Sequence, residues 1–130
     1  KTCWRREVIE VMKTCPNVYA DLSYHDDAFK RISRLAYHEV LEEVMADGDL
    51  KSRVMFGTDW PMIRHTWTMA DYTRKYLKGL DEGIVRAITF DNPLQFLFAG
   101  KLPQRLRTFY GDRLDAIPHW LRDVLGEAQG

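Results

Sequence analysis

Apolar residues recur every three to four positions over residues 4–14, with charged residues around the other face. This spacing predicts an amphipathic helix at the start of the chain. A longer stripe of the same period predicts a second helix, which Asp26 or Asp27 caps and which runs to about Ala46. Gly48 follows it and is suited to a left-handed C-cap.

Two short runs rich in β-forming residues, 18–23 and 53–56, stand on either side of the second helix. Strands joined by a long helix predict a right-handed parallel βαβ unit. The stretch 57–66 is expected to be a loop, in which Pro61 biases Trp60 towards an extended conformation. Because a parallel sheet needs more than two strands, the pattern indicates a helix-rich α/β fold that is the back end of a larger barrel or doubly wound sheet.

Helical spacing returns in the second half of the chain. A helix is predicted over about residues 67–78, closing at Gly79, and Asp81 is expected to cap the next short helix. Asn92 is a favoured N-cap for the helix that follows. The remaining predictions are buried side chains at Leu94, Phe96, Leu97 and Phe98, an irregular basic stretch over 101–111 and a helix over 114–125.

Composition narrows the class of protein. A hydrophobic content of 45% over 130 residues is sufficient for a packed core in one domain or part of one. The formal net charge of zero predicts no nucleic-acid partner, and no apolar run is long enough to cross a membrane. Cys3 and Cys15 lie about 18 Å apart along one predicted helix and cannot pair, which favours a reducing, cytoplasmic location. The sequence starts at Lys1, which indicates a trimmed or truncated product.

Asp59 is the candidate for chemistry. It follows a β-prone run and Gly57, so it is expected at the carboxyl end of a strand, where α/β folds place their catalytic residues. The alternative is a turn-capping role, which is common for Asp.

Three motifs occur in a recognisable order: Pro-Asn-Val-Tyr-Ala-Asp-Leu-Ser at 16–23, Arg-Val-Met-Phe-Gly-Thr-Asp-Trp-Pro at 53–61 and Asp-Asn-Pro-Leu-Gln-Phe-Leu-Phe at 91–98. Together they resemble the C-terminal third of the amidohydrolase-related family, (β/α)₈ barrels that include aminocarboxymuconate-semialdehyde decarboxylase-like enzymes. The resemblance implies that residues 1–99 are the C-terminal segment of a TIM-like barrel, with its last two β/α units. The resemblance does not extend to residues 100–130, which are expected to form a C-terminal helical extension.

The resemblance also implies a role for Asp59 as metal ligand and catalytic carboxylate. The cofactor would be a divalent metal, zinc by default, in the full-length enzyme. The family's His-x-His pair and its histidines after the fifth and sixth strands have no counterpart here. Because one carboxylate does not make a metal site, this segment is expected to bind no metal and to be inactive by itself.

Three residues near the expected strand ends are candidates for substrate binding: His25, Trp60 and His65. Each has a structural alternative, since loop histidines are often solvated and tryptophans often belong to the core. His38 is interpreted as a surface residue of its helix, and Tyr72 and Tyr76 as packing residues.

The resemblance implies that the parent enzyme hydrolyses or decarboxylates a small organic substrate, carboxylated or aromatic-derived. The missing N-terminal part of the barrel would then be the partner of this segment. The alternative is a non-catalytic structural or dimerisation domain, which buries apolar surface in a homo-oligomer.

Overall fold

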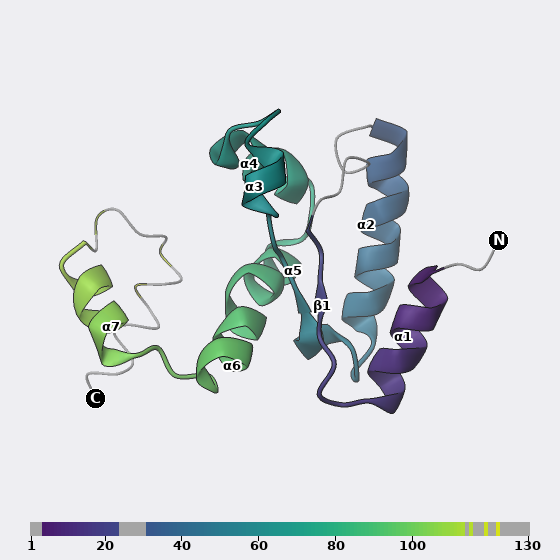
Figure 1. Ribbon diagram of the computed structural model, residues 1–130, viewed down its shortest axis with the longest axis horizontal. Coiled ribbons are helices and arrows are strands. Elements are labelled where there is room, and N and C mark those ends of the chain that lie inside the picture. Colours follow the sequence, from purple (N-terminus) through teal and green to yellow (C-terminus); the bar gives the residue numbers. More distant parts are fainter. Residues whose placement is uncertain (1–3, 24–30, 114, 116–118, 120–121, 123–130) are drawn as a thin grey trace.

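In the part of the chain that the structure describes, two short parallel strands lie among helices (Figure 1). The computed structural model describes residues 4–23, 31–113, 115, 119 and 122. The strands are β1 (Ala20–Asp21) and β2 (Val54–Met55), and they pair in parallel. The helices are α1 (Trp4–Thr14), α2 (Arg31–Ala46), the 3₁₀ turn η2 (Lys51–Arg53), α3 (Trp60–Ile63), α4 (Met69–Leu77), α5 (Glu82–Arg86), the π-helical turn η3 (Ala87–Asp91), α6 (Asn92–Phe98) and α7 (Gln104–Gly111).

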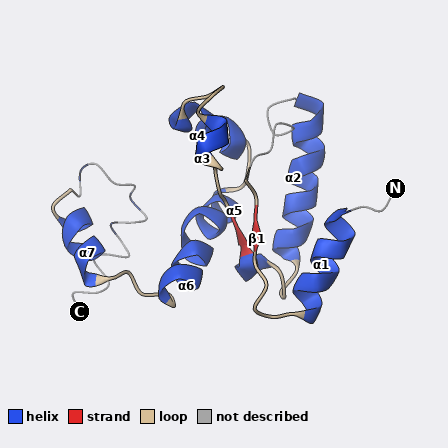
Figure 2. Cartoon of the chain, in the orientation of Figure 1, coloured by secondary structure: helices blue, strands red, loops and turns tan. Residues whose placement is uncertain are grey.

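The helices form three groups around the strands. α1 and α2 lie on one side, α5 and α6 follow β2 on the other, and α3 and α4 lie beyond the carboxyl ends of both strands (Figures 1 and 2). α7 lies at the end of the molecule furthest from α1 (Figure 1). The arrangement confirms the predicted helix-rich α/β segment with two parallel strands.

Alternation along the strands decides which side chains enter the core. Val54 is 2% exposed and belongs to the main cluster of buried side chains, which helices on both sides of the strands supply. Leu22 and Phe56 pack against the same cluster. Because successive strand side chains point to opposite faces, Asp21 and Gly57 lie on the other face of the sheet. The buried members of the cluster are Met12, Leu41, Leu50, Val54, Leu80 and Ile88.

A second core cluster lies under α3 and α4. Tyr72 and Tyr76 are fully buried there beside Ile63. The ring of Phe56 lies 4.8 Å from that of Tyr76 and 6.3 Å from that of Tyr72, centroid to centroid. The predicted packing role of both tyrosines is confirmed, and β2 therefore connects the two clusters through Phe56.

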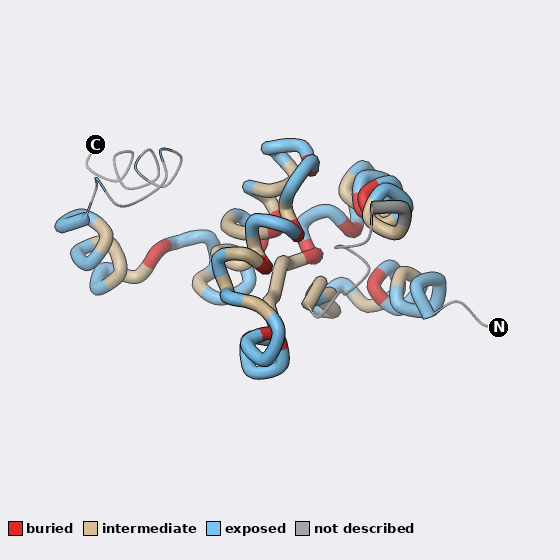
Figure 3. The backbone as a smooth tube through the Cα atoms, turned by 90° about the horizontal axis from the view of Figure 1, so that it is seen from above, coloured by how far each residue is buried: buried red, intermediate tan, exposed pale blue. Residues whose placement is uncertain are grey.

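The first helix has the predicted bounds, but its apolar stripe is only partly covered. Met12 is 2% exposed, whereas Trp4 is 79% exposed and Val8 and Val11 are also exposed. Figure 3 shows buried residues gathered near the middle of the molecule and α1 largely at the surface. α1 thus carries more apolar surface than the described residues bury.

Arg53 joins α1 to the strands. It is buried, and its guanidinium donates to the carbonyl oxygens of Met12, Cys15, Val18 and Asp49 at 2.6 to 3.1 Å. The carbonyls at the end of α1 have no partners within their own helix, so a cation there satisfies them and complements the helix dipole. Arg53 was predicted as the first residue of a strand, but it ends η2 instead.

The outer edge of β2 is covered by helical residues. The N–H of Leu22 donates to the carbonyl of Met55, so Val54 and Phe56 turn their backbone groups away from β1. There the N–H of Phe56 donates to the carbonyl of Ile88 at 2.8 Å. The Asn92 side chain donates to the carbonyl of Val54 at 2.7 Å.

Asn92 therefore has a different role from the one predicted. Asp91 and Asn92 both have helical backbone angles, because η3 runs directly into α6, and Asn92 does not cap a helix. Its amide nitrogen also donates to the carbonyl of Lys51 at 2.7 Å, and the side chain is buried. The residue fastens α6 to β2.

Two stretches predicted to be irregular contain helices. The expected loop 57–66 holds α3, with Pro61 in its first turn and Trp60 as its first residue rather than an extended one. Proline fits this position because its nitrogen needs no hydrogen bond there. The stretch 101–111 holds α7, which begins after Pro103.

Other predictions were wrong at single positions. Gly48 does not adopt the left-handed conformation, whereas Gly79 does, with φ of 88° at the end of α4. Phe96 and Leu97 are 51% and 61% exposed rather than buried. His38 is 8% exposed, and burial lowers its pKa.

Some expectations fall outside the described residues: the capping role of Asp26 and Asp27, and most of the predicted helix 114–125. Among the described residues, no helix is both long and apolar enough to cross a membrane. Cys15 is a free cysteine.

Candidate active site at the carboxyl ends of the strands

The two strands end side by side, which brings the residues after them to one edge of the sheet. Asp21 ends β1, and Met55 is its register partner in β2. The N–H of Leu22 donates to the carbonyl of Met55 at 2.9 Å, so pairing continues one residue past β1. Gly57 and Asp59 follow β2 at this same edge, where parallel sheets place their active sites.

Asp59 has a strained backbone. Its φ of 46° and ψ of 49° lie in the left-handed region, which costs a residue with a Cβ about 1–2 kcal/mol. The side chain is exposed and makes no capping bond to α3. Its carbonyl instead accepts the N–H groups of Met62 and Ile63 at 2.9 and 3.2 Å. Since the side chain makes no capping bond to α3, the Asp59 carboxylate is left exposed at this edge of the sheet.

The two other described candidates lie beyond Asp59 on α3 and the turn after it. Trp60 is 54% exposed, and the guanidinium carbon of Arg64 lies 5.3 Å from its ring centroid. His65 is exposed. Trp60 is therefore not a core residue, and its ring with the Arg64 cation above it is available to a ligand. The third candidate, His25, lies outside the described residues.

Sequence reasoning missed Asp21. Its carboxylate accepts the N–H of Ser23 at 2.7 Å. A Cβ built on Gly57 would lie 2.4 Å from both carboxylate oxygens, so the Asp21 side chain lies against the α-carbon of Gly57. The sequence does contain a signal for Asp21. It stands between Ala20 and Leu22, which pack against the core, so the alternation of side chains along a strand places Asp21 on the other face.

Two tyrosine hydroxyl groups, joined by a hydrogen bond, hold the backbone at the end of β1. Tyr76 donates to the carbonyl of Leu22 at 2.9 Å. Its oxygen is hydrogen-bonded to the hydroxyl of Tyr37. Since Tyr76 has a single hydroxyl proton, Tyr37 is the donor in that second bond. α2 and α4 thereby fix the backbone one residue after Asp21.

Burial raises the pKa of Tyr37 to about 12, and the pKa of Tyr76 is raised for the same main reason. The folded chain therefore keeps these protons after the unfolded chain, whose tyrosines titrate near pH 10, has lost them. It follows that stability is full below about pH 10 and falls as the pH rises towards 12.

We expect wild-type stability to fall by an amount on the order of 2 kcal/mol between pH 9 and 11.5, and the Tyr37→Phe variant to lose distinctly less. The variant keeps the bond from Tyr76 to Leu22. Urea unfolding at fixed pH values measures both chains. Parallel declines would show that Tyr37 is not a source of the alkaline sensitivity.

The described residues do not form a complete metal site. No group of three or more histidine, cysteine, aspartate or glutamate side chains lies close enough together in the described ranges to hold an ion. Asp59 supplies an exposed carboxylate, which suits one ligand position, but zinc sites take three or four protein ligands.

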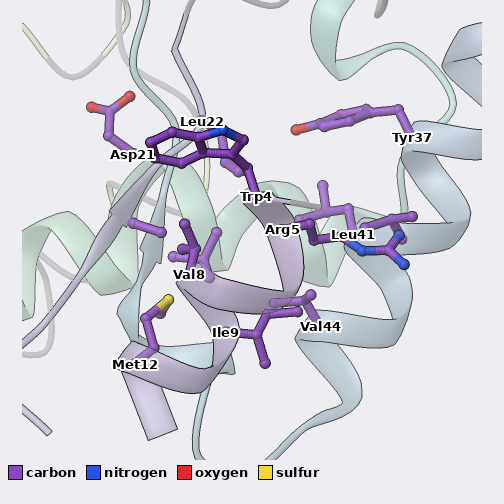
Figure 4. Close-up of a pocket in the computed structure, with 13 residues that line it drawn as sticks. Trp4, Arg5, Val8, Ile9, Met12, Asp21, Leu22, Tyr37, Leu41 and Val44 are labelled. Atoms are coloured by element: carbon purple, nitrogen blue, oxygen red, sulfur yellow. The ribbon is translucent and has the colours of Figure 1, made fainter. Parts of the chain in front are cut away.

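A cavity of about 490 Å³ lies elsewhere, between α1, α2 and the strands. Its walls are mainly apolar, with Val8, Met12 and Leu41 among them, and Tyr37 points towards its upper end (Figure 4). The carboxylate of Asp21 points away from it (Figure 4). Asp21 is among its lining residues, whereas Asp59, Trp60 and His65 are not. The cavity therefore borders the end of β1 that carries Asp21 and lies apart from these three candidates.

Comparison with known proteins gives one result. A sequence model of the family described as Amidohydrolase matches residues 3–99, which include both strands and Asp59. No curated protein and no solved structure matches the chain.

Proposed function

The chain belongs to the amidohydrolase family, and from this membership we propose that it is the C-terminal part of a metal-dependent hydrolase or decarboxylase with Asp59 at its reacting centre. One observation carries the proposal: Asp59 has a left-handed backbone and an exposed carboxylate, and it lies four residues after the end of β2, at the carboxyl edge of the sheet. The substrate would be a small organic molecule, because the match is to a family of small-molecule enzymes and the formal charge of zero attracts no nucleic acid.

The chemistry of Asp59 follows from its position. A bound divalent metal would act as a Lewis acid, which polarises the substrate or activates a water molecule for attack. The Asp59 carboxylate can hold a proton during the reaction or occupy one ligand position. Trp60 and Arg64 would form the rim on the side of α3, with a flat ring and a cation above it. His25 and His65 remain candidates for substrate contact.

The surface of α1 supports a partner. Trp4, Val8 and Val11 leave an apolar stripe exposed beside β1. In this proposal the N-terminal part of the barrel covers that stripe and completes the site. The same stripe also suits a second function, a non-catalytic dimerisation domain, in which another copy of the chain covers it.

We expect the Asp59→Asn variant of the longest protein in this reading frame to lose at least about 100-fold in turnover, because the amide neither binds a divalent ion well nor accepts a proton. Metal content per chain and turnover of small amide and carboxylic-acid substrates are the measurements. Asp49→Asn is the matched control, since Asp49 is exposed and precedes β2, at the opposite end of the sheet.

The outcomes separate the two functions. Near-stoichiometric metal in the wild type that falls in Asp59→Asn supports a ligand role. Unchanged metal with lost turnover assigns Asp59 to proton transfer. A stable dimer with neither metal nor turnover would overturn the enzyme proposal in favour of the dimerisation domain.

A further inference from the structure

We propose that Asp21 is a second carboxylate of this site and that it selects substrates carrying an N–H donor, an ammonium or amide group, near the reacting centre. The inference rests on the proposed function for its biological meaning. Ligand binding by Asp21 at the ends of β1 and β2 can be measured without any catalytic activity.

The position of Asp21 is fixed by the sheet. Val54 packs in the core, and its register partner Ala20 packs against the same cluster. Asp21 is the next residue of β1, so its side chain lies on the opposite face, at the carboxyl end of the strand. The carbonyl of Leu22 accepts from Tyr76 at 2.9 Å. The backbone that follows Asp21 is therefore held in place.

Gly57 makes room for this carboxylate. Its φ is not positive, so its backbone conformation does not require glycine. What requires glycine is space, because an added Cβ would lie 2.4 Å from both oxygens of Asp21. Two residues span at most about 7 Å, so Asp59 lies within that distance of Gly57 along the chain. The carboxylate of Asp21 and the backbone that carries Asp59 therefore meet at Gly57.

The Asp21 carboxylate retains acceptor capacity. Among the described residues, its hydrogen bond comes from the N–H of Ser23, and no ion pair reaches it. A carboxylate accepts about four hydrogen bonds, and Asp21 is exposed.

The chemistry follows from the sign of the charge. A ligand N–H can donate to the free oxygen, and an ammonium group adds charge assistance. A ligand carboxylate at the same place would be repelled. The absence of a side chain at position 57 thus leaves room for this acceptor at the carboxyl edge of the sheet.

The test uses backbone-amide chemical shifts of the chain during titration with benzylammonium, benzamide and benzoate. We expect benzylammonium and benzamide to shift the amide signals of Asp21, Ser23 and Gly57, and benzoate to leave them unchanged. In Asp21→Asn, which keeps the volume and the acceptor for Ser23, the Kd of benzylammonium should rise about tenfold or more.

Matched variants separate the site from general effects. Gly57→Ala should weaken benzylammonium binding as Asp21→Asn does, whereas Gly48→Ala should not, because a Cβ at Gly48 meets nothing within 4 Å. Asp49→Asn is the control for charge. Equal binding by Asp21→Asn and wild type, or tighter binding of benzoate than of benzylammonium, would overturn the inference. The titration measures neither metal content nor turnover. The Asp59→Asn experiment therefore tests the proposed function, and the titration tests the role of Asp21 separately.

Discussion

Replacing Arg53 by Met is expected to destabilise the chain by roughly 3–5 kcal/mol, which is a large part of the stability of a small domain. Arg53 is buried, and its guanidinium donates to four carbonyl oxygens on three segments of the chain. Met fills a similar volume but donates nothing, so the buried carbonyl of Met12 and the partly buried carbonyls of Val18 and Asp49 lose this donor. Urea unfolding followed by circular dichroism measures the change.

Two further variants test the cause. Arg53→Lys keeps the charge but presents a compact ammonium that cannot reach all four oxygens. The free energy of unfolding of this variant should therefore lie between those of Arg53→Met and the wild type. Arg105→Met is the control, because Arg105 is an exposed residue of α7 and should change stability by less than about 0.5 kcal/mol. A loss below 1 kcal/mol in Arg53→Met would show that the hydrogen bonds from Arg53 to the four carbonyls contribute little to stability.

Replacing Asn92 by Asp should destabilise the chain by about 3 kcal/mol or more at pH 7. The Asn92 amide donates to the carbonyls of Lys51 and Val54, each at 2.7 Å, and a carboxylate in its place would face two oxygens without a proton. Burial and these oxygens would raise the pKa of the new carboxyl group in the folded chain. The loss should therefore be smallest below about pH 4 and should grow as the pH rises.

Urea unfolding from pH 3.5 to 7.5 measures the difference in the free energy of unfolding between Asn92→Asp and the wild type at each pH. Asn17→Asp makes the same chemical change at an exposed position and should show no such growth. A pH-independent loss in Asn92→Asp would mean that the carboxyl group does not face the two carbonyls.

The sequence by itself determined the parts that depend on local spacing. The stripe of residues 4–14 predicted α1 with its observed bounds, and the β-prone runs on either side of the second helix predicted a parallel pair. The motif around Asp59 predicted a carboxylate at the carboxyl end of the second strand. These features follow from periodicity, propensity and turn chemistry, which act over a few residues.

Only the tertiary structure decided which polar groups satisfy one another across the chain. Arg53 bonds to Met12 over 41 positions, and Asn92 to Val54 over 38. Asp21 lies against Gly57, whose lack of a side chain has no local cause. No pattern within a window of a few residues contains such pairings, because each depends on the distance that folding sets between distant segments. The polar contacts that fasten this fold, and the contact between Asp21 and Gly57, are therefore visible only in three dimensions.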